Sequence, residues 1–168
     1  LDLFHSLLDG HSQILQLPGV IIGNKKFTKI FSNNNPLDMS SDFIKNYEHF
    51  FDSRLNTLER HHMLGESKDQ HYFVDKKKFK INLLKIFQKK KSNYKNKLYE
   101  NILMIHQAYA QTCGHDISKK KILIINSHLI PYTKYIAKKI GNVDLDIIHT
   151  IRDPLSALSS VTKNWLRY

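Results

Sequence analysis

The residues most suited to chemistry follow an apolar run near the end of the chain. Arg152 comes directly after residues 147–151, and Ser160 lies eight residues beyond the arginine. Asp153 and Pro154 suit the cap and the first position of a helix. This order predicts a guanidinium at the carboxyl end of a strand and a hydroxyl on the following helix, which together suit a phosphate group. The spacing alone leaves open an arginine that caps a neighbouring helix and a serine that faces the core.

A histidine occupies a similar place after a second apolar run. Residues 122–125 are all isoleucine or leucine, and Asn126, Ser127 and His128 follow them. Such a run is typical of a strand that is covered on both faces. A histidine at its carboxyl end can accept a proton from a hydroxyl near neutral pH. Because the chain holds ten histidines, a purely structural role for His128 is the competing interpretation.

The elements that must position these residues form a mixed α/β pattern. Apolar spacing and capping residues predict the following elements: a helix ending at Leu8, a strand at 14–17, a loop over 23–41, a helix over 42–64, a helix capped by Asp75, a helix over 95–112, strands at 122–126 and 145–151 with a helix over 131–140 between them, and a last helix from Asp153. Strands alternating with helices imply parallel pairing through right-handed crossovers. We therefore expect one domain over 1–168 with an all-helical insertion at about 42–112. The aromatic stripe of the 42–64 helix is expected to be core rather than a ligand platform.

Composition limits the partners of the protein. The net charge of +11 favours an anionic partner, which includes nucleic acid, a membrane surface or a phosphorylated small molecule. The lysine runs at 76–78, 89–91 and 119–121 are expected to be solvated faces. No apolar run approaches the roughly 20 residues that span a membrane, and no histidine spacing matches a metal site. The single Cys113 excludes an intrachain disulfide and weakly favours a reducing compartment such as the cytoplasm.

The segments around Arg152 and His128 resemble motifs of the sulfotransferases that use 3′-phosphoadenosine 5′-phosphosulfate (PAPS). In that family, an arginine at a strand end and a serine eight residues later bind the 3′-phosphate of the nucleotide. Arg152 and Ser160 have this spacing, and the sequence Ile-His-Thr-Ile-Arg-Asp-Pro is similar to the family pattern. Residues 4–14 resemble the helix after the family's phosphosulfate loop, where Leu-Leu-Asp-x-His-Pro is common. Here Ser12 replaces the proline.

The resemblance also implies a role for His128. Cytosolic members of the family carry Lys-Thr-His-Leu-Pro after a buried strand, and the histidine is the catalytic base. This chain has Asn126-Ser127-His128-Leu129 followed by Ile130-Pro131. Asn126 stands where the family has a lysine that assists sulfuryl transfer, so that role is absent here or supplied by another residue.

The resemblance implies a P-loop-type parallel sheet flanked by helices, and transfer of a sulfuryl group from PAPS to a hydroxyl or amine acceptor without a metal. It covers both ends of the chain but not the middle. The family's glycine-rich loop and its later basic loop would lie before Leu1 and after Tyr168. We therefore expect a fragment of a longer reading frame that does not catalyse alone. The alternatives are a basic nucleic-acid-binding module and a non-catalytic relative that keeps the fold.

Overall fold

The structure, a computed structural model, describes residues 7–23, 25–55, 64–89, 96–127, 129–141 and 143–148, and beyond these Asp153, Leu155, Leu158, Ser159 and Thr162. Within them it is a mixed α/β structure, which confirms the fold class at that level. Its strands and helices are β1 (Ile14–Leu15), α2 (Lys25–Phe31), α3 (Pro36–Asn46), α4 (Lys76–Lys89), α5 (Lys97–Thr112), β2 (Ile122–Leu123) and α6 (Ile130–Ile140). No helix in the described part of the chain is long and apolar enough to cross a membrane.

The two strands pair in parallel and form a small sheet. Ile14 lies opposite Ile122, and Leu15 lies opposite Leu123. The amide of Ile124 donates to the carbonyl of Leu15 over 2.9 Å, which continues the ladder beyond β2. The prediction that this apolar run is covered on both faces is wrong, because Ile122 is 53% exposed.

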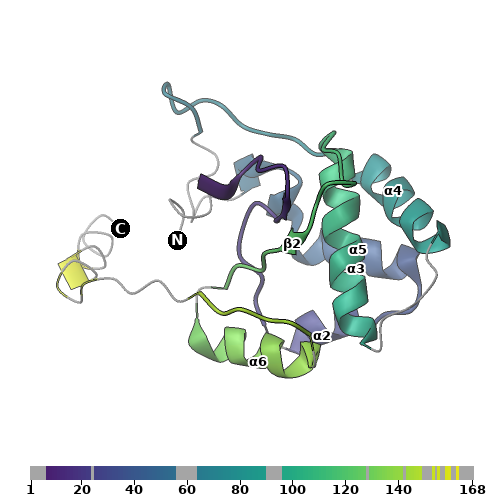
Figure 1. Cartoon of the computed structure of the whole chain (residues 1–168). Helices are drawn as coiled ribbons and strands as arrows, with labels where there is room; N and C mark the ends of the chain where they lie inside the picture. The colour runs from purple at the N-terminus through teal and green to yellow at the C-terminus, as the bar shows by residue number, and fades with distance from the viewer. Residues whose placement is uncertain are drawn as a thin grey trace.

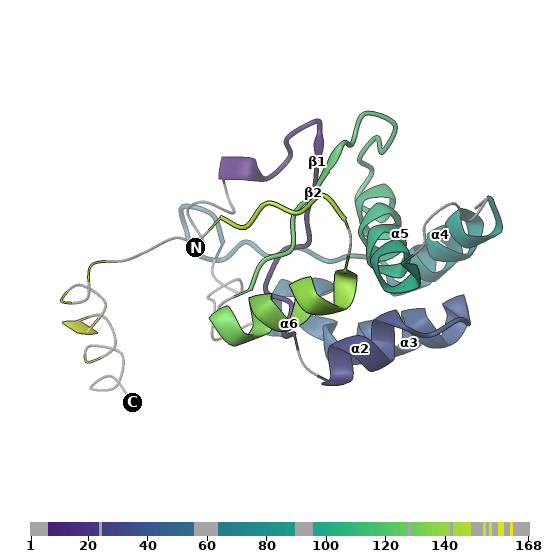
Figure 2. The ribbon, with the colours of Figure 1, turned by 60° about the horizontal axis from the view of Figure 1, so that its bottom comes forward.

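The helices between the strands enclose an aromatic core. In Figures 1 and 2, α5 lies between the sheet on one side and α4 on the other. Phe43 of α3 is fully buried, and its ring centroid lies 6.0 Å from that of Phe31 and 5.7 Å from that of Phe79. The expectation that the stripe is core is confirmed, since its members are all buried: Phe43, Tyr47, Phe50 and Phe51.

The loop predicted for 23–41 is wrong, because α2 and residues 36–41 of α3 lie there. The reason is local. The side chain of Asn35 accepts a hydrogen bond from the amide of Leu37 over 2.9 Å, and Pro36 occupies the first turn of α3. An Asn-Pro pair serves a helix start as well as a turn, because proline needs no hydrogen-bond acceptor at the first helical position.

The helix predicted over 42–64 is also wrong across 47–55. α3 ends at Asn46, and the chain then makes two short 3₁₀ turns at Glu48–Phe50 and Ser53–Leu55. Backbone bonds to a distant segment replace helical ones: Val74 donates to Phe51 over 2.8 Å, and Ser53 donates to Tyr72 over 3.1 Å. The hydroxyl of Tyr109 also bonds to the carbonyl of Phe50. Residues 56–63 lie outside the described residues.

The predicted cap Asp75 is confirmed, and capping residues also mark one end of α5 and of α6. The carboxylate of Asp75 accepts from the amides of Lys77 and Lys78 over 2.8 and 3.0 Å at the start of α4. Asn96 caps α5 in the same way, accepting from the amide of Tyr99. Gly141 follows α6 with a φ of 70°, a left-handed conformation that glycine adopts without strain.

The strand predicted at 145–151 is absent from 145–148. After α6 the chain reverses and residues 143–148 run back in the direction opposite to that helix (Figures 1 and 2). No described strand pairs with them, and Ile147 and Ile148 are 61% and 72% exposed. Apolar composition favours a strand only where a neighbouring strand satisfies its backbone groups. Residues 149–151 lie outside the described part of the chain.

Candidate functional site

The carboxyl ends of β1 and β2 form one edge of the sheet. Because the strands are parallel, the segments that leave them start at the same side. They stay together, since the amide of Ile21 donates to the carbonyl of Asn126 over 2.9 Å. In open parallel sheets, ligands bind outside this edge. We call residues 16–22 and 124–127 the strand-end edge.

The start of α6 borders the strand-end edge. A Cβ atom at Gly23 would meet the carbonyl of Tyr132 at 2.5 Å and Cγ1 of Ile136 at 2.7 Å, so only glycine allows α6 to pack this closely. Leu129 precedes the helix and provides no side-chain cap. Pro131 has no N–H group, and the amides of Tyr132 and Thr133 donate to the carbonyl of Leu129 over 3.0 and 3.1 Å, so this helix start offers few free donors to an anionic group.

A buried histidine lies close to the sheet on α5. His106 is 1% exposed, and its Nδ1 lies 2.8 Å from the carbonyl of Ile102, so Nδ1 carries the hydrogen. Its Nε2 has no hydrogen-bond partner among the described residues. Burial lowers the pKa of His106 to about 4, against the opposing effect of the backbone groups of Ile102 and Ile124. His106 is therefore neutral at pH 7, and its burial keeps it away from any substrate in solution.

The structure leaves the predicted site residues undecided. The candidate base His128 and the candidate phosphate ligands Arg152 and Ser160 all lie outside the described residues. Their flanking residues Ser127 and Leu129 are described, and the Ser127 hydroxyl donates to the carbonyl of Leu129 over 3.4 Å. The roles of the three residues stay predictions from the sequence.

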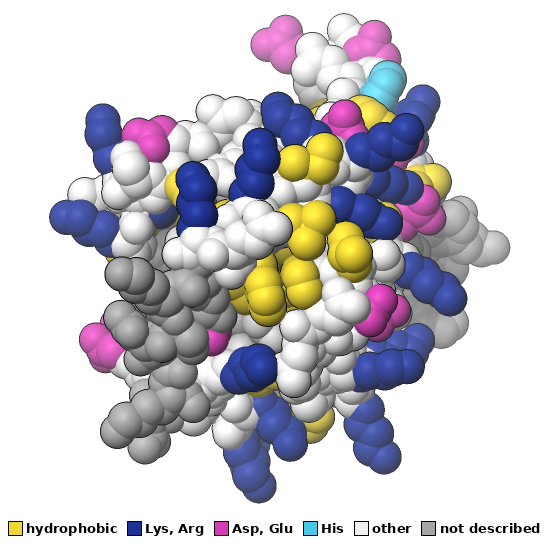
Figure 3. Space-filling view, turned by 90° about the vertical axis from the view of Figure 1, so that its right-hand side faces the viewer, with side chains coloured by type: hydrophobic (Ala, Val, Ile, Leu, Met, Phe, Trp, Pro, Cys, Tyr) yellow, Lys and Arg dark blue, Asp and Glu magenta, His cyan; other side chains and the backbone are white. Residues whose placement is uncertain are grey.

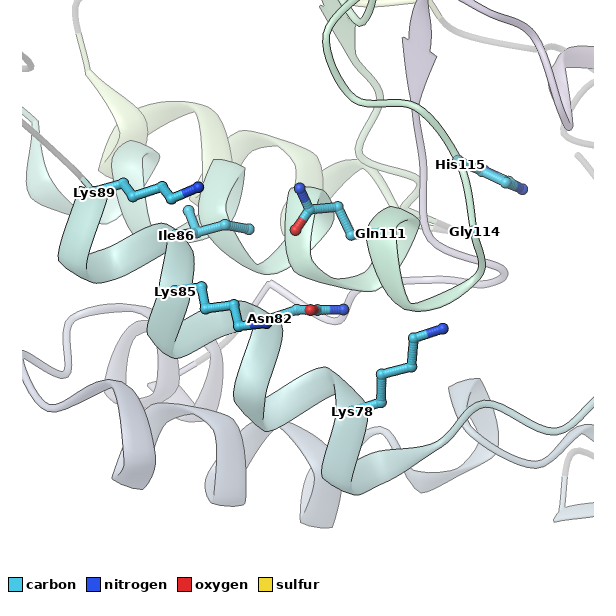
Figure 4. A pocket seen from close by; sticks show the side chains of 8 residues that line it. All are labelled: Lys78, Asn82, Lys85, Ile86, Lys89, Gln111, Gly114 and His115. Atoms are coloured by element: carbon cyan, nitrogen blue, oxygen red, sulfur yellow. The ribbon is translucent and has the colours of Figure 1, made fainter.

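A second site lies between α4 and the end of α5, and the sequence analysis did not identify it. It is an open pocket of about 390 Å³ whose polar lining includes Lys78, Asn82, Lys85, Lys89, Gln111 and His115 (Figure 4). We call it the α4 groove. No acidic side chain lines it. Lys78, Lys85 and Lys89 are seven and four residues apart, and this spacing places them on one face of a helix. It is the feature of the sequence that could have indicated the groove.

No family model, curated protein sequence or solved structure matches this chain. The chemistry of the protein is therefore inferred from its residue pattern and from the strand-end edge and the α4 groove.

Proposed function

We propose that this chain belongs to a P-loop-type sulfotransferase, which moves a sulfuryl group from PAPS to a hydroxyl or amine acceptor. The observation that carries the proposal is the arginine and serine, eight residues apart, after the apolar run at 147–151. A guanidinium presents a fork of N–H donors that matches phosphate oxygens, and a hydroxyl adds a further donor.

The arrangement of the described elements supports this proposal without deciding it. β1 and β2 are parallel, as the proposed fold requires, and α6 follows β2 as a crossover helix would. The chain then runs back toward Asp153 through 143–148 (Figure 1). The strand-end edge, bordered by the uncapped start of α6, is the place where such a fold would hold a nucleotide.

Each proposed residue has one role. Arg152 and Ser160 would hold the 3′-phosphate of PAPS and so orient the donor. His128 would accept the proton of the acceptor hydroxyl as its oxygen attacks sulfur. The new oxygen–sulfur bond then forms while the bond from sulfur to the phosphate oxygen breaks, and adenosine 3′,5′-bisphosphate leaves. Positioning and charge stabilisation would do most of the work, as in phosphoryl transfer.

Calorimetric binding of adenosine 3′,5′-bisphosphate tests the proposal. Arg152→Ala should weaken binding by about 2–4 kcal/mol, because a charge-assisted phosphate contact is lost. Arg54→Ala is the matched control: Arg54 is exposed and paired with Asp52 over 2.6 Å, and it should leave the affinity unchanged. Unchanged affinity in Arg152→Ala, or no saturable binding to the unaltered chain, would reject the nucleotide site.

A nucleic-acid-binding module is the second candidate, favoured by the net charge of +11. Figure 3 shows Lys and Arg side chains distributed all over the face seen there rather than gathered in one stripe. Binding to duplex DNA that weakens steeply with salt would favour this candidate, since each phosphate contact releases counterions. Bisphosphate binding without any transfer activity in the complete reading frame would instead favour a non-catalytic relative.

A further inference from the structure

Three lysines give the α4 groove a positive charge, and no acidic side chain lines it. Lys78, Asn82, Lys85 and Lys89 follow one another at intervals of four, three and four residues, so they lie along one face of α4. α4 contains no acidic residue, and no ion pair found within the described ranges involves these three lysines.

A carboxylate at the start of α4 offsets part of the charge of Lys78 but does not line the groove. Asp75 lies just before α4, and its Oδ1 accepts from the backbone amides of Lys77 and Lys78. Lys78 uses one of its three donors on the carbonyl of Thr112, over 3.1 Å, at the end of α5. Lys85 and Lys89 are exposed, and their ammonium groups form no hydrogen bond within the part of the chain that the structure describes.

The opposite wall of the groove adds neutral donors. Gln111 lies on the α5 side, across the groove from Lys89 (Figure 4). The side-chain amide of Asn82 donates one hydrogen bond to the hydroxyl of Thr112 over 3.1 Å. A second amide hydrogen of Asn82 stays available. Amide and ammonium donors around an open space without carboxylates are suited to phosphate or sulfate oxygens.

We infer that the α4 groove binds a ligand that carries two or more phosphate or sulfate groups. The positions of Lys78 and Lys85 are roughly 10 Å apart along the helix axis, and those of Lys85 and Lys89 roughly 6 Å, at about 1.5 Å per residue. A single tetrahedral anion held by the neighbouring Lys85 and Lys89 would leave Lys78 without an anionic partner, whereas linked anionic groups can meet all three lysines. The pocket of about 390 Å³ has room for several such groups.

This site is separate from the strand-end edge. α4 lies on the far side of α5 from β1 and β2 in both views of the ribbon (Figures 1 and 2). The inference therefore does not depend on the proposed transferase function. A failure of one leaves the other intact.

Calorimetry with inorganic tripolyphosphate, at constant ionic strength set with chloride, tests the inference. One equivalent should bind at least about tenfold more tightly than orthophosphate, because two lysines engage linked phosphates. The double variant Lys85→Gln with Lys89→Gln should weaken tripolyphosphate binding by about 100-fold, at about tenfold for each charged contact. Lys77→Gln is the matched control, since Lys77 is an exposed lysine of the same helix that does not line the groove.

The outcomes separate a built site from diffuse charge. If Lys77→Gln weakens binding as much as each lysine lost in the double variant does, the inference is overturned. Equal affinities for orthophosphate and tripolyphosphate would also overturn it. Repeating the titration with a disulfated disaccharide shows whether the site prefers sulfate or phosphate groups. Tighter binding of either ligand than of orthophosphate supports the site if the double variant loses it. Unchanged binding of adenosine 3′,5′-bisphosphate to the double variant would confirm that the groove is not the nucleotide site.

Discussion

Acidification should destabilise this protein through His106. Burial holds the pKa of this side chain at about 4 in the folded chain, against an ordinary value of 6.5. Between these values the unfolded chain binds a proton that the folded chain excludes, so stability falls as pH falls below 6.5 and is unaffected above about 7. At about 1.4 kcal/mol per pH unit, the full loss is about 3.4 kcal/mol, of which about 2.5 kcal/mol is reached by about pH 4.5.

Urea unfolding followed by circular dichroism measures this loss. The free energy of unfolding should fall by about 2.5 kcal/mol between about pH 7.5 and pH 4.5, beyond the change seen in His106→Gln. Glutamine still offers a donor to the carbonyl of Ile102 but binds no proton in this range. His115→Gln removes a histidine that is exposed, and should keep the wild-type pH dependence. The same pH dependence in wild type and His106→Gln would refute the reasoning.

Three further substitutions test the packing. Phe43→Ala should cost about 3–5 kcal/mol of unfolding free energy because it empties the centre of the aromatic core, whereas Phe73→Ala, at an exposed position, should cost less than about 0.5 kcal/mol. Asn35→Ala should lower the unfolding free energy by about 1 kcal/mol, because it removes the side-chain cap of α3. Asn35→Asp keeps a capping oxygen and should retain the wild-type stability, so an equal loss in both variants would contradict the role of the cap. Gly23→Ala should cost about 1–3 kcal/mol, since its Cβ meets a backbone carbonyl of α6, and a neutral effect would show that α6 packs differently. All three are measured by denaturant titration.

Elements with a local start signal were predictable from the sequence. Asp75 before α4 and the glycines after α5 and α6 marked helix boundaries that the structure keeps, because a capping bond involves residues only two or three positions apart. The same kind of signal at Asn35-Pro36 was interpreted as a turn. An Asn-Pro pair can begin either a turn or a helix. The chain forms the helix α3 here because the apolar residues that follow are buried against a helix distant in the sequence.

Long-range pairing was not predictable from the sequence. The aromatic spacing after Phe43 fits a helix, yet the chain bonds to residues 72–74 and makes two turns instead. Residues 145–148 are apolar enough for a strand but lack a described partner. Lys78 and Lys89 belong to runs that the sequence predicts as solvated faces, and no expectation covers Lys85. That these lysines line a groove with Gln111 and His115 depends on how α4 packs against α5.

The sequence by itself predicts which residues bind phosphate or accept a proton, since the prediction for Arg152, Ser160 and His128 depends on their side-chain chemistry and spacing. It also determined that aromatic side chains would form the core, because burying them is favourable in any arrangement. The sequence predicted parallel pairing, but the tertiary structure alone decided that Ile14 pairs with Ile122, that α6 starts at the shared edge of β1 and β2, and that lysines of α4 line a groove with the end of α5. These features join residues far apart in the chain, and contact between such residues is set by packing rather than by local preference.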